Sequence, residues 1–224
     1  MSASEIGGIV RPGGDRLYGK GELALDRAIH WVGVGAGAAG AVALLIVFVG
    51  NHGTRGLVAV LLYAVCLMAM LCCSAAYNLS SPSPRQEWLR RLDHAAIFLM
   101  IAGTYTPFTV LRLAGGWSIL LTAVVWSVAL LGAAAKLLFP RRLEGASVVI
   151  YLALGWIGVI AAQPIAAALD LPSLVLLAAG GLLYTLGTAF HLWRSLPFQN
   201  AIWHGCVLSA AGCHYAAVML SVAL

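Results

Sequence analysis

Apolar runs of about 20 residues, separated by short polar breaks, dominate this chain of 224 residues. A run of that length is what an α-helix needs to cross a hydrocarbon core of about 30 Å. About seven such runs follow one another, near residues 28–50, 57–78, 93–113, 117–139, 146–163, 172–192 and 200–223. The fifth run is cut short by Gln163 and Pro164. The pattern predicts an all-α fold, a seven-helix transmembrane bundle.

Composition agrees with a membrane environment, because hydrophobic residues make up 62% of the chain and charged residues only 9%. A water-soluble fold needs more polar surface than that. We expect one transmembrane domain over residues 28–224, preceded by a polar N-terminal tail over residues 1–27 that lacks the apolar core of a secretory signal. No Lys/Arg-rich stretch with interleaved aromatic residues is present, so nucleic-acid binding is not expected.

The Lys and Arg residues predict the orientation of the bundle. All but two of the thirteen fall in the tail or in the second, fourth and sixth breaks, and the two exceptions are Arg55 and Arg112. The others are Arg11, Arg16, Lys20, Arg27, Arg85, Arg90, Arg91, Lys136, Arg141, Arg142 and Arg194. Because basic residues favour the cytoplasmic side, the N-terminus is expected in the cytoplasm and the C-terminus outside.

This orientation places a set of polar residues at one depth, near the cytoplasmic leaflet. Within this set Ser74 and Asn78 are spaced i, i+4, and so are Asn200 and His204. The two members of each pair therefore share a helix face. The set comprises Ser74, Asn78, Asp93, His94, Asn200 and His204, with His30 and His191 in the same layer. Polar groups gathered from several helices can form a site for a metal or a polar ligand. The alternative is that they satisfy one another across helices without any ligand.

A second polar stretch, Thr104 to Thr106, precedes Pro107 in the third run. Proline frees a helix carbonyl, and neighbouring hydroxyl groups can cover carbonyls of this kind. We expect a kinked structural element here. For His214, deeper in the seventh run, we expect a hydrogen bond between helices.

Several segments resemble the hemolysin III family, the bacterial branch related to the progestin and adipoQ receptors. They are SAAYN at 74–78, RLDHAAIF at 91–98, IAGTYTPF at 101–108 and NAIWH at 200–204, with further similarity in ELALDRAIHWVG at 22–33 and GGLLYTLG at 180–187. The resemblance implies a seven-helix bundle with a cytoplasmic N-terminus, in a bacterial inner membrane. It also implies a lipid-related role in membrane homeostasis.

The resemblance further implies a zinc site near the cytoplasmic leaflet. Relatives hold zinc with three histidines, one ending the second span and two spaced i, i+4 in the seventh, beside a serine and an aspartate. Ser74, Asp93 and His204 match that pattern, whereas Asn78 and Asn200 stand at the other two ligand positions. A neutral amide oxygen is a poor ligand for zinc, so we expect a zinc-free polar pocket. The alternative is that Asp93 or a nearby histidine, His94, His30 or His191, replaces the missing imidazoles.

Three function classes remain open. The first is a membrane protein whose pocket binds or acts on lipid. The second is a zinc-dependent lipid amide hydrolase, similar to the alkaline ceramidases, in which Asp93 is the general base and Ser74 polarises the carbonyl. The third is a pore-forming cytolysin, as the family name suggests.

Overall fold

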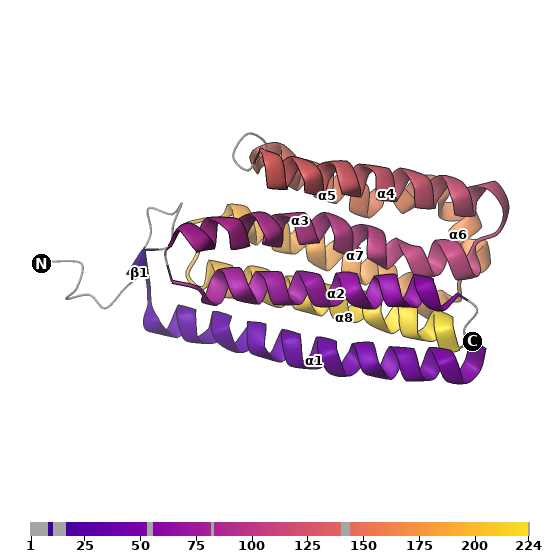
Figure 1. The fold of residues 1–224 in the computed structure, drawn as a ribbon, viewed down its shortest axis with the longest axis horizontal. Helices are drawn as coiled ribbons and strands as arrows, with labels where there is room; N and C mark the ends of the chain where they lie inside the picture. The colour runs from indigo at the N-terminus through magenta and orange to yellow at the C-terminus, as the bar shows by residue number, and fades with distance from the viewer. Residues whose placement is uncertain (1–8, 11–16, 53–55, 82, 140–143, 224) are drawn as a thin grey trace, which may run out of the picture.

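The computed structural model describes residues 9–10, 17–52, 56–81, 83–139 and 144–223. Within these residues seven helices are long and apolar enough to cross a membrane, which confirms the predicted bundle. Their bounds are Lys20–His52, Leu57–Leu79, Pro84–Arg112, Gly115–Leu138, Gly145–Ala168, Leu171–Leu192 and Gln199–Ala223. Figure 1 shows them running side by side along the long axis of the molecule.

The elements follow a simple order. A two-residue antiparallel pair, β1 (Ile9–Val10) and β2 (Leu17–Tyr18), precedes the first helix, with Ile9 opposite Tyr18. The helices are α1 (Lys20–His52), α2 (Leu57–Leu79), α3 (Pro84–Pro107), α4 (Gly115–Leu138), α5 (Glu144–Trp156), α6 (Ala162–Ala168), α7 (Leu171–Leu192) and α8 (Gln199–Ala223). A π-helical turn, η1 (Phe108–Arg112), follows α3, and a 3-10 turn, η2 (Ile157–Ala161), joins α5 to α6.

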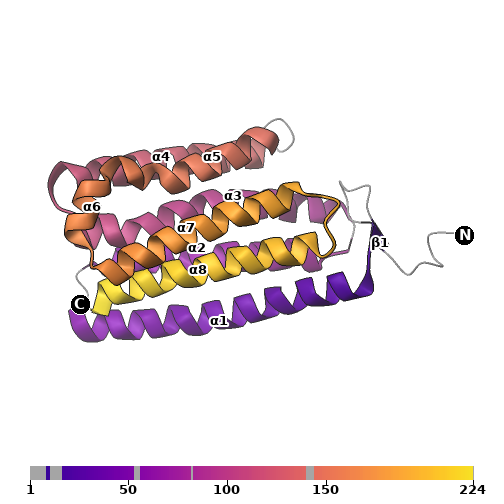
Figure 2. The ribbon, with the colours of Figure 1, turned by 180° about the vertical axis from the view of Figure 1, so that it is seen from behind.

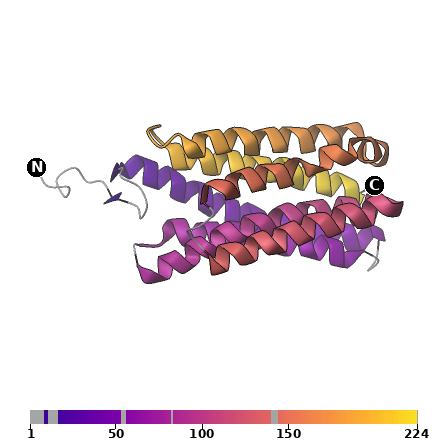
Figure 3. The same cartoon turned by 90° about the horizontal axis from the view of Figure 1, so that it is seen from above.

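The first and last helices pack together, and this contact positions the site. Helix α1 packs against α2 and α8, α7 packs along α8, and α3 packs between α2 and α4. Figures 1 and 2 show α4 and α5 on one side of the bundle and α1 on the opposite side. Seen from above in Figure 3, the N-terminal pair of strands and the C-terminus lie at opposite ends.

The third helix begins earlier than its apolar run. Ser83 caps it, accepting a hydrogen bond from the Gln86 amide, and Pro84 occupies the first helical position. Glu87 and Arg90, 2.9 Å apart, form an i, i+3 ion pair within this polar first section. The expectation that the span starts at Asp93 is therefore wrong. Asp93 lies more than two turns inside the helix.

The first and fifth spans also differ from their apolar runs. Helix α1 begins at Lys20, so the last residues of the predicted tail are helical. In the fifth span the irregular section is η2, and the chain continues through Pro164 in the first turn of α6. A proline in the first turn removes no intrahelical hydrogen bond, so Gln163 and Pro164 do not end the span.

The polar stretch beside Pro107 bonds to backbone and to a neighbouring helix, whereas the expected kink stays a prediction. Four side chains on α3, η1 and α4 form a threonine network, consisting of Thr106, Thr109, Thr122 and Trp126. The Trp126 indole donates to Thr106 Oγ1 at 3.0 Å, and Thr122 donates to Thr109 Oγ1 at 2.8 Å. Thr106 in turn donates to the Ala102 carbonyl at 2.8 Å. Thr106 thus bonds both to the backbone of its own helix and to a side chain of α4.

Helices α2 and α3 approach each other closely at Gly103. A Cβ atom at Gly103 would lie 2.6 Å from Cys66 Cβ, so only glycine permits this packing. The predicted interhelical bond of His214 is confirmed, since its Nε2 lies 3.2 Å from the Leu177 carbonyl oxygen.

Five basic residues used for the orientation lie outside the described residues, namely Arg11, Arg16, Arg55, Arg141 and Arg142. The orientation stays a prediction.

Candidate functional site

A polar stripe lies on the buried face of α1. Glu22, Asp26 and His30 are spaced four residues apart, and all three are buried. The Glu22 carboxylate accepts hydrogen bonds from the Phe198 amide at 2.6 Å and from the Gly19 amide at 2.8 Å. These bonds fix the start of α1 against the loop that leads into α8. The next residue of the stripe, Asp26, therefore faces α8.

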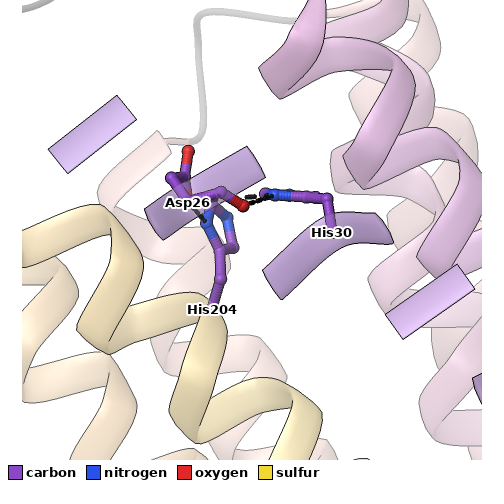
Figure 4. A group of neighbouring side chains, drawn as sticks. All are labelled: Asp26, His30 and His204. Atoms are coloured by element: carbon purple, nitrogen blue, oxygen red, sulfur yellow. Dashed lines mark hydrogen bonds and ion pairs between the residues drawn. The ribbon is translucent and has the colours of Figure 1, made fainter. Parts of the chain in front are cut away.

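Asp26 contacts two histidines from different helices, as Figure 4 shows. Its Oδ1 lies 2.6 Å from Nδ1 of His204 on α8 and 3.8 Å from Nδ1 of His30. The backbone carbonyl of Asp26 lies 2.7 Å from the same His30 nitrogen. The two imidazole rings meet edge to face, with their centroids 4.4 Å apart. Asp26 itself is only 1% exposed, so it lies behind both rings.

These contacts determine which nitrogen of each histidine is protonated. A backbone carbonyl can only accept a hydrogen bond, so Nδ1 of His30 donates to it. An ionised Asp26 likewise accepts from Nδ1 of His204. In the neutral state of each ring, Nε2 then carries the lone pair. Acidic and carbonyl partners orient metal-binding and catalytic histidines in the same way.

Ser74 on α2 contacts His30 of this group. Its hydroxyl oxygen lies 3.3 Å from Nε2 of His30. One turn later the Asn78 amide donates to the Ser74 carbonyl at 3.0 Å and to the Ser74 hydroxyl oxygen at 3.4 Å. The predicted shared face of Ser74 and Asn78 is therefore present, and it points toward α1.

Asp93 completes the cluster from α3. It is buried, it interacts with the Ser74 side chain, and it lies within electrostatic range of His204. Helices α1, α2, α3 and α8 thus each contribute an acid, a hydroxyl or an imidazole. We call Asp26, His30, Ser74, Asp93 and His204 the acid-histidine cluster.

A cavity of about 1290 Å³ opens beside this cluster. Its wall includes all five residues predicted for the site, Ser74, Asn78, Asp93, Asn200 and His204. The same cavity continues along α8 from His204 to His214, a distance of about 15 Å at the usual rise of a helix. Apolar side chains line this continuation, among them Ile97, Met100, Leu152, Val207 and Leu208.

Two further predicted histidines lie on the cavity wall, away from the contact between Asp26, His30 and His204. The His94 carbonyl accepts a hydrogen bond from Tyr151 at 2.9 Å, and the His191 ring packs against Trp203. Sequence reasoning placed His30 in the polar layer but missed Asp26. The i, i+4 spacing of Asp26 and His30 in LDRAIH was the available signal.

Asp26, His30 and His204 could also hold a metal ion. One donor atom from each lies within 4.8 Å of the others. A carboxylate with two imidazoles is a common set of ligands for zinc and other divalent metals. Asn78 does not fit such a role, because a neutral amide oxygen is a poor ligand for zinc. Any metal site here would therefore use α1 in place of the end of α2.

Comparison with known proteins gives one family. The family described as Haemolysin-III related matches residues 24–215. The "Hemolysin-3" of Bacillus cereus is 39% identical over 186 residues, which cover 81% of this chain and 84% of that protein. The "Hemolysin-3 homolog" of Bacillus subtilis (strain 168) is 35% identical over 180 residues, covering 80% of this chain and 84% of that protein.

A more distant relative is human. The "Monocyte to macrophage differentiation factor" of Homo sapiens is 28% identical over 165 residues, covering 70% of this chain and 67% of that protein. No solved structure matches the chain.

Proposed function

The chain belongs to the haemolysin-III related family, and on that premise we propose that its cavity binds a lipid whose polar head lies against the acid-histidine cluster. The observation that carries the proposal is the two-part wall of the cavity. One end gathers four of the five cluster residues, His30, Ser74, Asp93 and His204, and the remainder runs along α8 between largely apolar side chains. An amphiphile with one polar and one apolar part matches such a wall.

The polar end suits a head group with both donors and acceptors. The carboxylate of Asp93 accepts hydrogen bonds, the amides of Asn78 and Asn200 offer donors and acceptors, and the Ser74 hydroxyl does both. Amide and hydroxyl groups close to an acyl chain meet these requirements. We therefore place a ceramide-like or acylglycerol-like head at this end.

The distribution of Lys and Arg supports a cytoplasmic location for the polar end. The head group would then enter from the inner leaflet of a bacterial cell membrane. A role in membrane homeostasis follows, because such a protein would sample lipids of the leaflet in which it lies.

The amount of lipid bound to the purified protein tests the proposal. Native mass spectrometry of the purified chain should show about one lipid per protein, and filling the cavity through Leu152→Trp should remove it. Leu186→Trp is the matched control, since Leu186 is 51% exposed on the outside of the bundle and is not on the cavity wall. Equal lipid content in both variants would contradict the proposal.

A second candidate function is a metal-dependent lipid amide hydrolase. The contact between Asp26, His30 and His204 favours it, because these three residues offer the ligands that Asn78 and Asn200 do not. A zinc ion held there would polarise a carbonyl group and lower the pKa of a bound water. Asp93 would accept a proton from the reacting group, and Ser74 would orient the substrate carbonyl.

Elemental analysis separates this candidate from the first. About one zinc per chain, lost in His30→Ala, supports the metal-dependent reading, whereas well below one zinc per chain rejects it. Asn78→His combined with Asn200→His should raise the zinc content if the family's arrangement of ligands is inherited.

The name hemolysin, which both Bacillus relatives carry, points to a third candidate, a pore-forming cytolysin. Adding the purified chain to dye-loaded, protein-free liposomes tests it. Leakage that rises with protein concentration supports a pore, and no leakage at low or high ionic strength rejects it.

A further inference from the structure

Ser74 has the surroundings of a reacting hydroxyl group. It is half-buried on the cavity wall, and its oxygen lies 3.3 Å from Nε2 of His30. That distance is within the range of a nucleophile and its base before substrate binds. The hydroxyl therefore faces both a base and the space in which a lipid would lie.

The opposite side of the His30 ring supplies the third member of such an arrangement. Nδ1 donates to the Asp26 carbonyl oxygen at 2.7 Å, which holds the lone pair on Nε2, toward Ser74. The Asp26 carboxylate lies 3.8 Å from the same Nδ1, where its charge would stabilise a protonated ring. Orientation of the base and stabilisation of its charged form are the two roles of the acid in a Ser-His-Asp triad.

Serine catalysis also needs a donor for the oxyanion. The Asn78 amide nitrogen donates to the Ser74 carbonyl at 3.0 Å and lies 3.4 Å from the Ser74 hydroxyl oxygen, so one of its N–H groups is beside the atom that attacks. The asparagine that cannot serve as a good zinc ligand is thus suited to a reaction without a metal.

We propose that Ser74, His30 and Asp26 form a nucleophilic triad that cleaves an acyl ester or amide in the cavity. The proposal rests on the proposed function, because the substrate is the lipid placed there. Ser74 Oγ attacks the carbonyl carbon while its proton passes to His30 Nε2. The bond to the leaving alcohol or amine breaks as His30 returns the proton to that group. Water then attacks the Ser74 ester by the same route and releases a fatty acid.

Asp93 is the other acceptor that faces Ser74. His30 fits the role of base better, because only the imidazole has a second nitrogen fixed by Asp26. A metal bound through Nε2 of His30 would occupy the lone pair that the base needs. The triad and a metal bound in that way exclude each other.

Covalent labelling with a long-chain alkyl fluorophosphonate tests the triad. Intact-mass analysis should show one alkylphosphonyl group per chain, and peptide mapping should place it on Ser74. Ser74→Ala should abolish the adduct, and His30→Asn should slow its formation by about 100-fold or more, the usual contribution of a general base. Asp93→Asn should retain labelling. Thr104→Ala is the matched control, since Thr104 lines the same cavity but its hydroxyl bonds to the Met100 carbonyl.

Three outcomes would overturn the triad. They are an adduct mapped to another residue, labelling lost in Asp93→Asn but kept in His30→Asn, and labelling abolished by a chelator. The mapping uses the unmodified chain, so it decides the matter even where a variant does not fold. Native mass spectrometry separates the two proposals, because lipid bound without labelling refutes the triad alone, whereas absence of bound lipid refutes the proposed function.

Discussion

The acid-histidine cluster and the threonine network are both polar groups within an apolar bundle, yet their bonding differs. In the threonine network the hydroxyl groups bond to neighbouring backbone or to one another, as Thr106 does with the Ala102 carbonyl. In the cluster, side chains from four helices meet one another, and all of them except Asp26 line a cavity. The first arrangement joins α3, η1 and α4 near a proline. The second leaves polar groups directed toward a space that a ligand can enter.

The comparison shows why polar residues within a membrane bundle need different interpretations. A threonine that bonds within its own helix adds little to the cost of membrane burial, because no charge is involved. Asp26 and its two histidines place ionisable groups inside the bundle, which is far more costly and is usually tied to function. Substitutions in the threonine network should therefore change stability without changing ligand binding, whereas substitutions in the acid-histidine cluster should affect the ligand or its chemistry.

The largest loss of stability is expected from Asp26→Ala. The change leaves Nδ1 of His204 without its acceptor and removes the carboxylate that lies 3.8 Å from Nδ1 of His30, and it should lower the free energy of unfolding by about 2–4 kcal/mol. Thermal or denaturant unfolding in detergent measures it. Asp26→Asn keeps an acceptor oxygen and should lose less. An Asp26→Ala protein as stable as the unmodified chain would contradict the assigned bonding.

A smaller loss is expected from Thr106→Val in the threonine network. Removing the hydroxyl leaves the half-buried Trp126 indole N–H without its acceptor, at a cost of about 1–3 kcal/mol. Lipid content should not change, because the network is scaffold. Thr106→Ser keeps the hydroxyl and serves as the control. Loss of bound lipid in a folded Thr106→Val protein would show that the two regions are not separate.

The smallest change in stability is expected from Ser74→Ala. Polar contacts between membrane helices contribute about 0.6 kcal/mol on average, so unfolding should shift little. Labelling by the fluorophosphonate should nevertheless disappear. This pairing of small structural cost with full chemical loss distinguishes Ser74 from every member of the threonine network. If the Ser74→Ala protein were labelled to the same extent as the unmodified chain, this distinction between Ser74 and the threonine network would be contradicted.

Length and apolar character were sufficient to predict the seven helices, because a bilayer admits few other solutions. The ends of the helices were less predictable. Paired charges such as Glu87 and Arg90 extend α3 beyond its apolar run. Asp93 therefore lies inside the helix and not at its start. Sequence patterns carry little information on such polar extensions.

Part of the candidate site also followed from the sequence. Ser74, Asn78, Asp93, Asn200 and His204 were expected at one depth, and all line one cavity. Asp26 was missed because its role depends on the packing of α1 against α8, between residues 178 positions apart. The i, i+4 pair with His30 was visible, but nothing in the pattern indicated which helix it faced.

Photocrosslinking with a fatty-acid analogue that carries a diazirine on its chain tests the central claim most directly. The claim is that a lipid lies in the cavity with its head at the acid-histidine cluster. Adducts should map to cavity residues such as Met100, Leu152 and Val207, and excess unlabelled lipid should suppress them. Adducts confined to outward residues such as Leu182 and Leu186, with no competition, would contradict it.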